Sequence, residues 1–274
     1  IRRLLHRIEP DELYHLAGQS HVGLSFEIPE STCQEIAGAT LSILEICRDL
    51  ARPPRIYHAS SSEVFGAPAE VPQNETTAFR PATPYGCAKA FATNIASVYR
   101  QAHGLFVCNG LLYNHESPRR GENFVTKKIA AGAALHVQGR AGCLELGNLS
   151  AERDWGFARE YAQAMILMLR HESPDDYVVA TGTSTSVRDF AAAAYGALGV
   201  ELVFEGAGLE EVGFEKKNGN VLIRVNPHFY RPTEPGELVG DARKAEKILG
   251  WRATTTARNV AELMARAEVE NYQG

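Results

Sequence analysis

Short apolar runs alternate with longer stretches of helical periodicity in the first half of the chain. Buried strands are predicted at residues 12–17, 55–60 and 105–113. Helices are predicted at residues 1–8, 29–51, 82–103 and from about residue 122. Strands that alternate with helices at this spacing are typical of crossover units on a parallel sheet. We therefore predict an α/β fold with a parallel sheet.

From about residue 139 the predicted elements become shorter and less regular. Short strands are predicted at residues 143–146, 177–180, 202–204 and 221–225. Helices are predicted at residues 157–170, 187–198, 242–249 and 256–271. This change indicates a smaller mixed α/β lobe that packs on the first part of the chain.

Composition adds exclusions to this picture. The chain has 274 residues, 45% of them hydrophobic, and a net charge of -5, which argues against a broad nucleic-acid surface. We therefore expect no binding to nucleic acid. We also expect a cytoplasmic protein that does not enter a membrane, because no run reaches the roughly 18 apolar residues of a spanning helix. Five cysteines without a CxxC spacing predict reduced thiols in the core.

Several common active-site motifs are missing from the sequence. It contains no GxGxxG after the first strand, no Walker A motif, no GxSxG and no HExxH. We therefore expect no metal centre and no Ser-His-Asp hydrolase.

Tyr85 and Lys89 form a YxxxK pair on a predicted helix. A separation of four residues places both side chains on one helix face, and an ammonium group lowers the pKa of a nearby phenol. Such a pair can take a proton from a sugar hydroxyl while hydride leaves the same carbon. By composition alone the pattern arises in about a quarter of such chains, so chance is the alternative.

Ser61 and Glu63 follow the strand at residues 55–60, where active residues gather in parallel sheets. The hydroxyl can bind a reacting oxygen, and the carboxylate can remove a proton next to a carbonyl. The alternative is a simple turn with a solvated charge at Glu63.

A local basic cluster follows the strand at residues 105–113. A helix beginning near Glu122 would add backbone amide donors, so the cluster suits a diphosphate. The alternative is a solvated loop. The cluster comprises Asn114, His115, Arg119, Arg120, Lys127 and Lys128.

Blocks along nearly the whole chain resemble the GDP-mannose 4,6-dehydratase family of the extended short-chain dehydrogenase/reductase superfamily. They include ASSSEVFG at residues 59–66, TPYGCAKAFA at 83–92, NHESPRRG at 114–121 and FYRPTEPGELVGDARKAEKILGW at 229–251. The resemblance implies a Rossmann-like catalytic domain with NADP at residues 1–138. It also implies that residues 139–274 form mainly the substrate lobe, with some segments returning to the Rossmann core.

The resemblance implies that GDP-mannose is converted to GDP-4-dehydro-6-deoxymannose and water by internal hydride transfer, for GDP-fucose and other deoxysugars. Tyr85, held by Lys89, would deprotonate the 4-hydroxyl, and Ser61 would bind the reacting oxygen. Glu63 would remove the proton from carbon 5 and assist loss of water. The family also implies a homodimer or homotetramer.

The family pattern further implies ligand contacts, one set for each ligand. Its cofactor residues map onto Leu16, Ala17, Gly18, Gln19, Ser20, Tyr85, Lys89, His115 and Arg120. Its GDP-sugar residues map onto Asn114, Lys128, Arg153, Arg231 and Glu234. The chain departs from the family at Ser61, usually threonine, and at Ser31, where a tyrosine is common.

The chain begins at Ile1, partway through a helical pattern and without a capping residue. Compared with the family, a glycine-rich cofactor segment of roughly 70 residues is expected before this point. One hypothesis is a dehydratase recorded without that segment. The alternatives are a catalytically inactive homologue that acts as a binding or oligomerisation partner, or another nucleotide-sugar epimerase or dehydratase of the superfamily.

Overall fold

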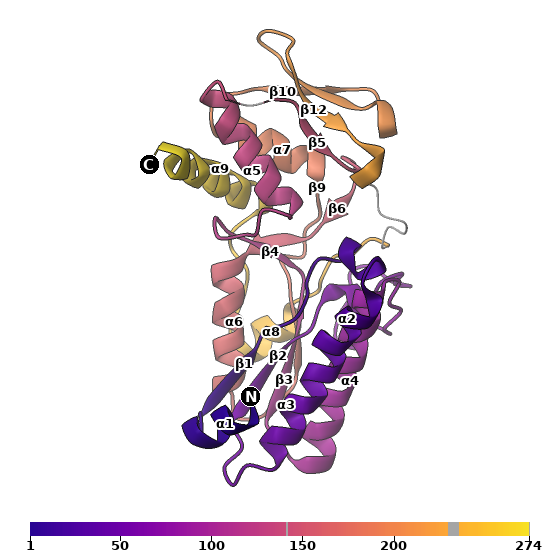
Figure 1. Ribbon diagram of the computed structural model, residues 1–274, viewed down its shortest axis with the longest axis vertical. Coiled ribbons are helices and arrows are strands. Elements are labelled where there is room, and N and C mark those ends of the chain that lie inside the picture. Colours follow the sequence, from indigo (N-terminus) through magenta and orange to yellow (C-terminus); the bar gives the residue numbers. More distant parts are fainter. Residues whose placement is uncertain (141, 230–235, 274) are drawn as a thin grey trace. The chain divides into compact units, whose positions relative to one another are not determined.

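The computed structural model describes residues 1–140, 142–229 and 236–273, and the chain divides into two compact units (Figure 1). Unit 1 comprises residues 1–113, 160–182 and 235–252. Unit 2 comprises residues 114–159, 183–234 and 253–274. Each unit is therefore assembled from three separate segments of the chain.

The sheet of unit 1 has four strands, all parallel, in the order β1-β2-β3-β8. Their bounds are β1 Glu12–His15, β2 Arg55–Ala59, β3 Val107–Leu112 and β8 Asp176–Val179. β3 is buried along its whole length, as expected of a central parallel strand. The predicted α/β fold with a parallel sheet is confirmed, and each of these strands lies within its predicted range to one or two residues.

Helices cover both faces of this sheet. The helices are α1 Arg2–Ile8, α2 Pro29–Cys33, α3 Ala39–Arg48, α4 Pro84–His103, α6 Ala158–Arg170 and α8 Arg243–Leu249. α3 and α4 pack together beside the sheet, and a 3-10 turn, η1 Gly23–Phe26, precedes α2. The helix predicted at residues 29–51 is interrupted: a π-helical turn, Gln34–Gly38, separates α2 from α3.

The predicted apolar face of the first helix is largely exposed in α1. Leu5 is buried in a core cluster with Leu44 and Ile56, whereas Ile1 is 74% exposed and Ile8 is 58% exposed. Periodicity identified this helix correctly, and Leu5 is the side chain that anchors it in the core.

Charged side chains occupy the outward-facing peptide groups of β8, which forms one edge of the sheet. Glu75 Oε1 accepts a hydrogen bond from Val178 N at 2.7 Å. Lys244 Nζ donates to the carbonyl oxygen of Asp176 at 2.8 Å. The peptide groups of residues 177 and 179 point toward β3 instead, as the hydrogen bond from Tyr113 N to Val179 O at 3.0 Å shows.

Unit 2 is built around a mixed sheet in the order β10-β11-β12-β5. β10, β11 and β12 are antiparallel neighbours, and β12 pairs with β5 in parallel. The other described strands of unit 2 form two short ladders, β4 with β7 and β6 with β9. The bounds are β4 Asn114–Glu116, β5 Leu144–Leu146, β6 Glu152–Arg153, β7 Trp155–Phe157, β9 Thr185–Ser186, β10 Leu202–Glu205, β11 Val212–Glu215 and β12 Val221–Val225.

Three helices pack together in the core of unit 2. They are α5 Val125–Val137, α7 Val187–Gly196 and α9 Ala257–Gln273. Trp155 and Phe190 lie at the centre of this core, with ring centroids 5.0 Å apart. Strand β11 and the two short ladders were not predicted, whereas β5, β10, β12 and the three helices were.

Two further properties concern the described residues of both units. None of the helices formed by these residues has the length and the apolar composition needed to cross a membrane. All five cysteines are free thiols, but only Cys47 and Cys108 are buried, so the prediction of core thiols is wrong for Cys33, Cys87 and Cys143.

Candidate active site

The carboxyl ends of β1, β2 and β3 lie at one edge of the parallel sheet in unit 1. Residues 16–20 follow β1, and Ser61 and Glu63 follow β2. Open parallel sheets bind their ligands beyond this edge. The topology therefore brings the predicted cofactor turn and two predicted catalytic residues to one edge of unit 1.

A short turn holds Ser61 and Glu63 in defined positions. Ser61 has an extended backbone and caps the 3-10 turn η3 Ser62–Val64, since its Oγ accepts a hydrogen bond from Glu63 N at 3.2 Å. Ser61 is 9% exposed and Glu63 is 8% exposed. The alternative of a solvated charge at Glu63 is therefore wrong.

Helix α4 presents Tyr85 and Lys89 from its first turns. Thr83 Oγ1 accepts from Gly86 N at 2.9 Å and Pro84 fits the first helical position, so the local sequence starts the helix here. Both side chains are 7% exposed, and Lys89 Nζ lies 5.7 Å from the centroid of the Tyr85 ring. The two side chains thus share one helix face, as predicted, and both are buried.

Lys89 is held against the end of β2. Its Nζ donates to the carbonyl oxygen of Ala59 at 2.7 Å, and burial lowers the pKa of Lys89 to about 8. An ammonium carries three donors, and this bond uses one. The two remaining donors of the Lys89 ammonium can therefore bind a ribose oxygen or a phenol oxygen.

Gly86 permits the close approach of α4 to the turn that holds Ser61 and Glu63. This role was not predicted from the sequence. A Cβ built on Gly86 would lie 2.6 Å from the carbonyl oxygen of Glu63. No side chain can occupy that space without moving the backbone, so the glycine allows Tyr85 and Glu63 to come from adjoining elements. Its place inside the YxxxK motif, directly after Tyr85, was the available signal.

The predicted cofactor turn at residues 16–20 depends on Gly18 and Gln19. Gly18 has a φ of +130°, which other residues rarely adopt. Gln19 Nε2 donates to Thr32 Oγ1 at 3.2 Å, and its Oε1 accepts from His21 N. Gln19 thus shapes the turn with its side chain, and Leu16, Ala17, Gly18 and Ser20 are exposed around it.

In unit 2, Arg120 is organised by a buried carboxylate that the sequence analysis did not single out. Glu116 is 2% exposed, and its Oε2 lies 3.0 Å from Arg120 Nε. The Arg120 guanidinium also stacks 3.5 Å from the ring centroid of Phe124. Thr126 Oγ1 donates to Glu116 at 2.7 Å, and burial raises the pKa of Glu116. Arg120 is therefore fixed before any ligand binds.

Two details of the predicted basic cluster are wrong. α5 begins at Val125 and not near Glu122, and its N-cap is Phe124, which has no polar side chain. Lys127 Nζ donates to Pro118 O at 3.0 Å and forms an ion pair with Glu268. Because Lys127 packs against α9 in this way, it serves the core of unit 2 rather than a diphosphate.

We expect Glu268→Gln to destabilise the protein by about 3 kcal/mol, because it leaves the Lys127 ammonium buried without its counter-charge. Urea unfolding measures this change. The matched control is Glu201→Gln, whose partner Lys216 forms an exposed pair with 60% and 68% side-chain exposure. The control should change stability by less than about 0.5 kcal/mol. Equal effects of the two variants would contradict the structural role of Lys127.

The remaining predicted ligand residues lie in unit 2 or outside the described residues. Asn114 and His115 belong to β4, and Arg153 belongs to β6. Lys128 Nζ lies 4.8 Å from the ring centroid of Phe229. Arg231 and Glu234 lie outside the described residues. The roles of these residues stay predictions.

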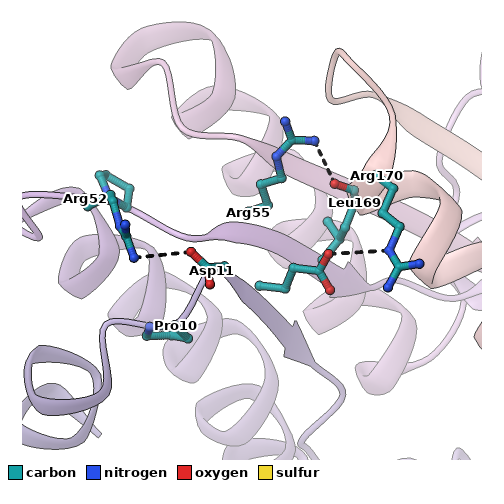
Figure 2. A pocket seen from close by; sticks show the side chains of 8 residues that line it. Pro10, Asp11, Arg52, Arg55, Leu169 and Arg170 are labelled. Atoms are coloured by element: carbon teal, nitrogen blue, oxygen red, sulfur yellow. Dashed lines mark hydrogen bonds and ion pairs between the residues drawn. The ribbon is translucent and has the colours of Figure 1, made fainter.

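A pocket of about 390 Å³ lies at the opposite end of the sheet in unit 1 (Figure 2). Glu12 and Arg55 are the first residues of β1 and β2, and both line it. Figure 2 shows Arg52 pointing to Asp11, and Arg55 donating to the carbonyl oxygen of Leu169 at 2.8 Å. This pocket is therefore remote from the strand ends that carry Ser61 and Glu63.

No group of three or more His, Cys, Asp or Glu side chains arranged to hold a metal ion occurs within residues 1–140, 142–229 and 236–273.

Comparison with known proteins decides the family. The sequence model described as GDP-mannose 4,6 dehydratase matches residues 1–264. The chain belongs to this family. A GDP-mannose 4,6 dehydratase from Drosophila melanogaster is 45% identical over 270 residues, which cover 98% of this chain and 68% of the relative. A GDP-mannose 4,6-dehydratase from Sinorhizobium fredii is 46% identical over 274 residues, 99% of this chain and 78% of the relative.

Solved structures outside the immediate family share the fold. RMD from Pseudomonas aeruginosa, complexed with NADPH, has a TM-score of 0.80 at 22% identity over 95% of this chain and 82% of that one. A dTDP-glucose 4,6-dehydratase from Streptomyces venezuelae, with NAD bound, has a TM-score of 0.79 at 20% identity over 100% and 78%. The predicted NAD(P)-binding Rossmann-like fold of the dehydratase family is confirmed.

Proposed function

We propose that the protein is a GDP-mannose 4,6-dehydratase, which converts GDP-α-D-mannose to GDP-4-dehydro-6-deoxy-D-mannose and water. One observation carries the proposal: Glu63 is buried in a turn that packs directly on the helix that presents Tyr85 and Lys89. Epimerisation or reduction at carbon 4 needs the tyrosine and lysine only. An eliminating carboxylate beside them supports dehydration.

NADP is the proposed cofactor, and when bound it supplies a reversible acceptor for the hydride of the sugar. The exposed turn at residues 16–20 and the buried donor on Lys89 fit a nicotinamide cofactor at the carboxyl edge of the sheet. His115 and Arg120 are the proposed further contacts. The NADPH in the RMD structure supports the choice of NADP.

Tyr85 begins the reaction as the base for the 4-hydroxyl of mannose. The neighbouring Lys89 ammonium favours the phenolate, because opposite charges lower the pKa of the phenol. Ser61 Oγ accepts from Glu63 N, so its own hydrogen is available to donate to the reacting sugar oxygen. Tyr85 thus takes the proton of the 4-hydroxyl, and Ser61 binds the oxygen at carbon 4.

Glu63 performs the elimination. The 4-keto group acidifies the proton on carbon 5, and the Glu63 carboxylate removes it and delivers a proton to the 6-hydroxyl, which leaves as water. Only 8% of Glu63 is exposed, so bulk water competes little for the proton it carries. A bound cofactor would return the hydride to carbon 6, and carbon 5 would regain a proton, equivalent to the one that Tyr85 took from the 4-hydroxyl. The sum of the steps is then loss of one water without consumption of cofactor.

The proposal extends to substrate contacts and cellular setting. Asn114, Lys128, Arg153, Arg231 and Glu234 are the proposed GDP-mannose contacts. We place the protein in the cytoplasm, supported by five free thiols, and in GDP-fucose or related deoxysugar synthesis. A homodimer or homotetramer is supported by apolar surface on α4, where Phe91 is 47% exposed and Val98 is 49% exposed.

A labelled substrate tests the function. When the protein is incubated with NADP and GDP-mannose deuterated at carbon 4, we expect a product that has lost one water and carries deuterium at carbon 6. Mass spectrometry and NMR detect both changes. A sugar of unchanged mass would indicate an epimerase, consumption of one NADPH per sugar would indicate a reductase, and binding without turnover would indicate an inactive partner.

A further inference from the structure

A row of four polar residues crosses the whole sheet of unit 1 on one face. The pairing registers align His15 with His58, His58 with Asn109, and Asn109 with Asp176. This face lies under α4, because Asn109 Nδ2 donates to Thr93 O and Ser97 Oγ at 3.2 Å each. Parallel strands covered on both faces normally carry apolar residues, so a buried polar row calls for a reason.

Both ends of the row are tied to helices. Asp176 Oδ1 accepts from Asn109 Nδ2 and from Arg100 of α4, at 2.8 Å each. At the other end, His15 Nε2 lies 3.1 Å from Thr40 Oγ1 of α3. Thr40 already donates its single proton to Ile36 O at 2.7 Å. His15 Nε2 must therefore be the donor, and this bond fixes the tautomer of His15.

The middle of the row lies beside Lys89. His58 directly precedes Ala59, whose carbonyl oxygen accepts from Lys89 Nζ. The rings of His15 and His58 have centroids 5.7 Å apart. Burial, and then the charge of Lys89, lower the pKa of His15 to about 4 and that of His58 well below its usual value. Both rings are therefore neutral at physiological pH, and each keeps one nitrogen lone pair.

His58 is the member of the row without a hydrogen-bond partner among the described residues. It is 2% exposed, and neither Nδ1 nor Nε2 has a partner there. The titratable groups on the elements packed around Lys89 are His15 and His58 from the sheet, Tyr85 from its own helix and Glu63 from the turn that packs on α4. His58 is thus a neutral polar side chain on the face of β2 under α4, one residue before the carbonyl oxygen that accepts from Lys89.

We propose that His58, supported by His15, is a positioning residue for Lys89: its neutral imidazole stabilises the ammonium in a site closed to water. A lone pair near a cation favours the charged form without adding a charge of its own. A protonated histidine would repel the ammonium, and an apolar residue would leave it unsupported. The proposal deepens the proposed function, since it explains how Lys89 stays charged beside Tyr85.

NMR of protein labelled with ¹³C,¹⁵N-lysine tests this proposal without using activity. The sequence has seven lysines, so the resonance of Lys89 can be assigned by its absence from Lys89→Met. In His58→Leu we expect the titration midpoint of Lys89 to fall by about one pH unit, because an apolar side chain replaces a polar group near the ammonium. His58→Gln, which restores a neutral acceptor, should return most of that shift.

Tyr57→Phe is the matched control. Tyr57 is the neighbouring residue on β2, its side chain lies on the opposite face, and its buried hydroxyl also has no hydrogen-bond partner among the described residues. This variant should leave the Lys89 midpoint unchanged. An unchanged midpoint in folded His58→Leu, or an equal shift in Tyr57→Phe, would overturn the proposal.

Wild-type protein provides a measurement that needs no core substitution. The Cε1 resonance of His58 should show no titration between about pH 5 and 8. A midpoint above about pH 6 would overturn the proposal even if His58→Leu failed to fold. If the Lys89 midpoint shifts as expected but no product forms from GDP-mannose, the proposed function fails and the positioning role stands.

Discussion

Glu63→Gln is expected to stop the reaction after its first half. The amide has the shape of the carboxylate but cannot accept the proton from carbon 5, so formation of the 6-deoxy product should fall by about 10²–10⁴-fold. Tyr85 and Lys89 are untouched, so the first oxidation should still proceed. Addition of GDP-mannose should therefore produce enzyme-bound reduced nicotinamide, seen by its near-ultraviolet absorbance.

Tyr85→Phe is the comparison that gives this result its meaning. It removes the phenol that takes the first proton, so neither reduced nicotinamide nor product should form at an appreciable rate. The two variants thus interrupt the reaction at different steps. If Glu63→Gln formed product at the normal rate, the assignment of the base would be wrong. If it formed no reduced nicotinamide, Glu63 would act before elimination.

Gly86→Ala is expected to lower kcat by about 10²-fold although no functional group is lost. The new Cβ would lie 2.6 Å from the carbonyl oxygen of Glu63 and 3.2 Å from Thr83 Oγ1. Backbone must move to relieve this contact, and the movement separates the Glu63 turn from the helix that carries Tyr85. Overpacking of this kind also lowers stability by about 1–3 kcal/mol, which a thermal melt would record.

Gly38→Ala is the matched control for the glycine prediction. Gly38 has a helical φ of -63°, and a Cβ built there meets no atom within 4 Å. Alanine at this position should leave kcat unchanged and raise stability by up to about 1 kcal/mol. A normal kcat in folded Gly86→Ala would show that α4 and the turn at Glu63 need no such close approach.

The strands and helices of unit 1 were predictable because their sequence signals are strong. β2 and β3 are short, mainly apolar segments bounded by breakers, and Thr83 with Pro84 marks the start of α4. The π-helical turn at Gln34–Gly38 was not predictable, since one extra residue in a helix leaves little trace in periodicity. The two-residue strands β6 and β9 are too short to show any alternation.

The candidate site was predictable by residue type but not by contact. Tyr85, Lys89, Ser61 and Glu63 were identified from spacing and resemblance. The partners that fix them depend on register and packing: Lys89 Nζ reaches the carbonyl oxygen of Ala59 because α4 packs over the end of β2. Lys127 is the opposite case: its residue type suggested a diphosphate site, but the packing of α5 on α9 pairs it with Glu268.

The capped outer edge of β8 has a consequence for the behaviour of the protein at high concentration. A bare edge strand offers a row of donors and acceptors to any other chain, and so invites aggregation. Here Glu75 and Lys244 already occupy the outward amide of Val178 and the outward carbonyl of Asp176. A strand of a neighbouring molecule would find these two groups already bonded, which lowers the tendency of this side of the sheet to form intermolecular β-pairs.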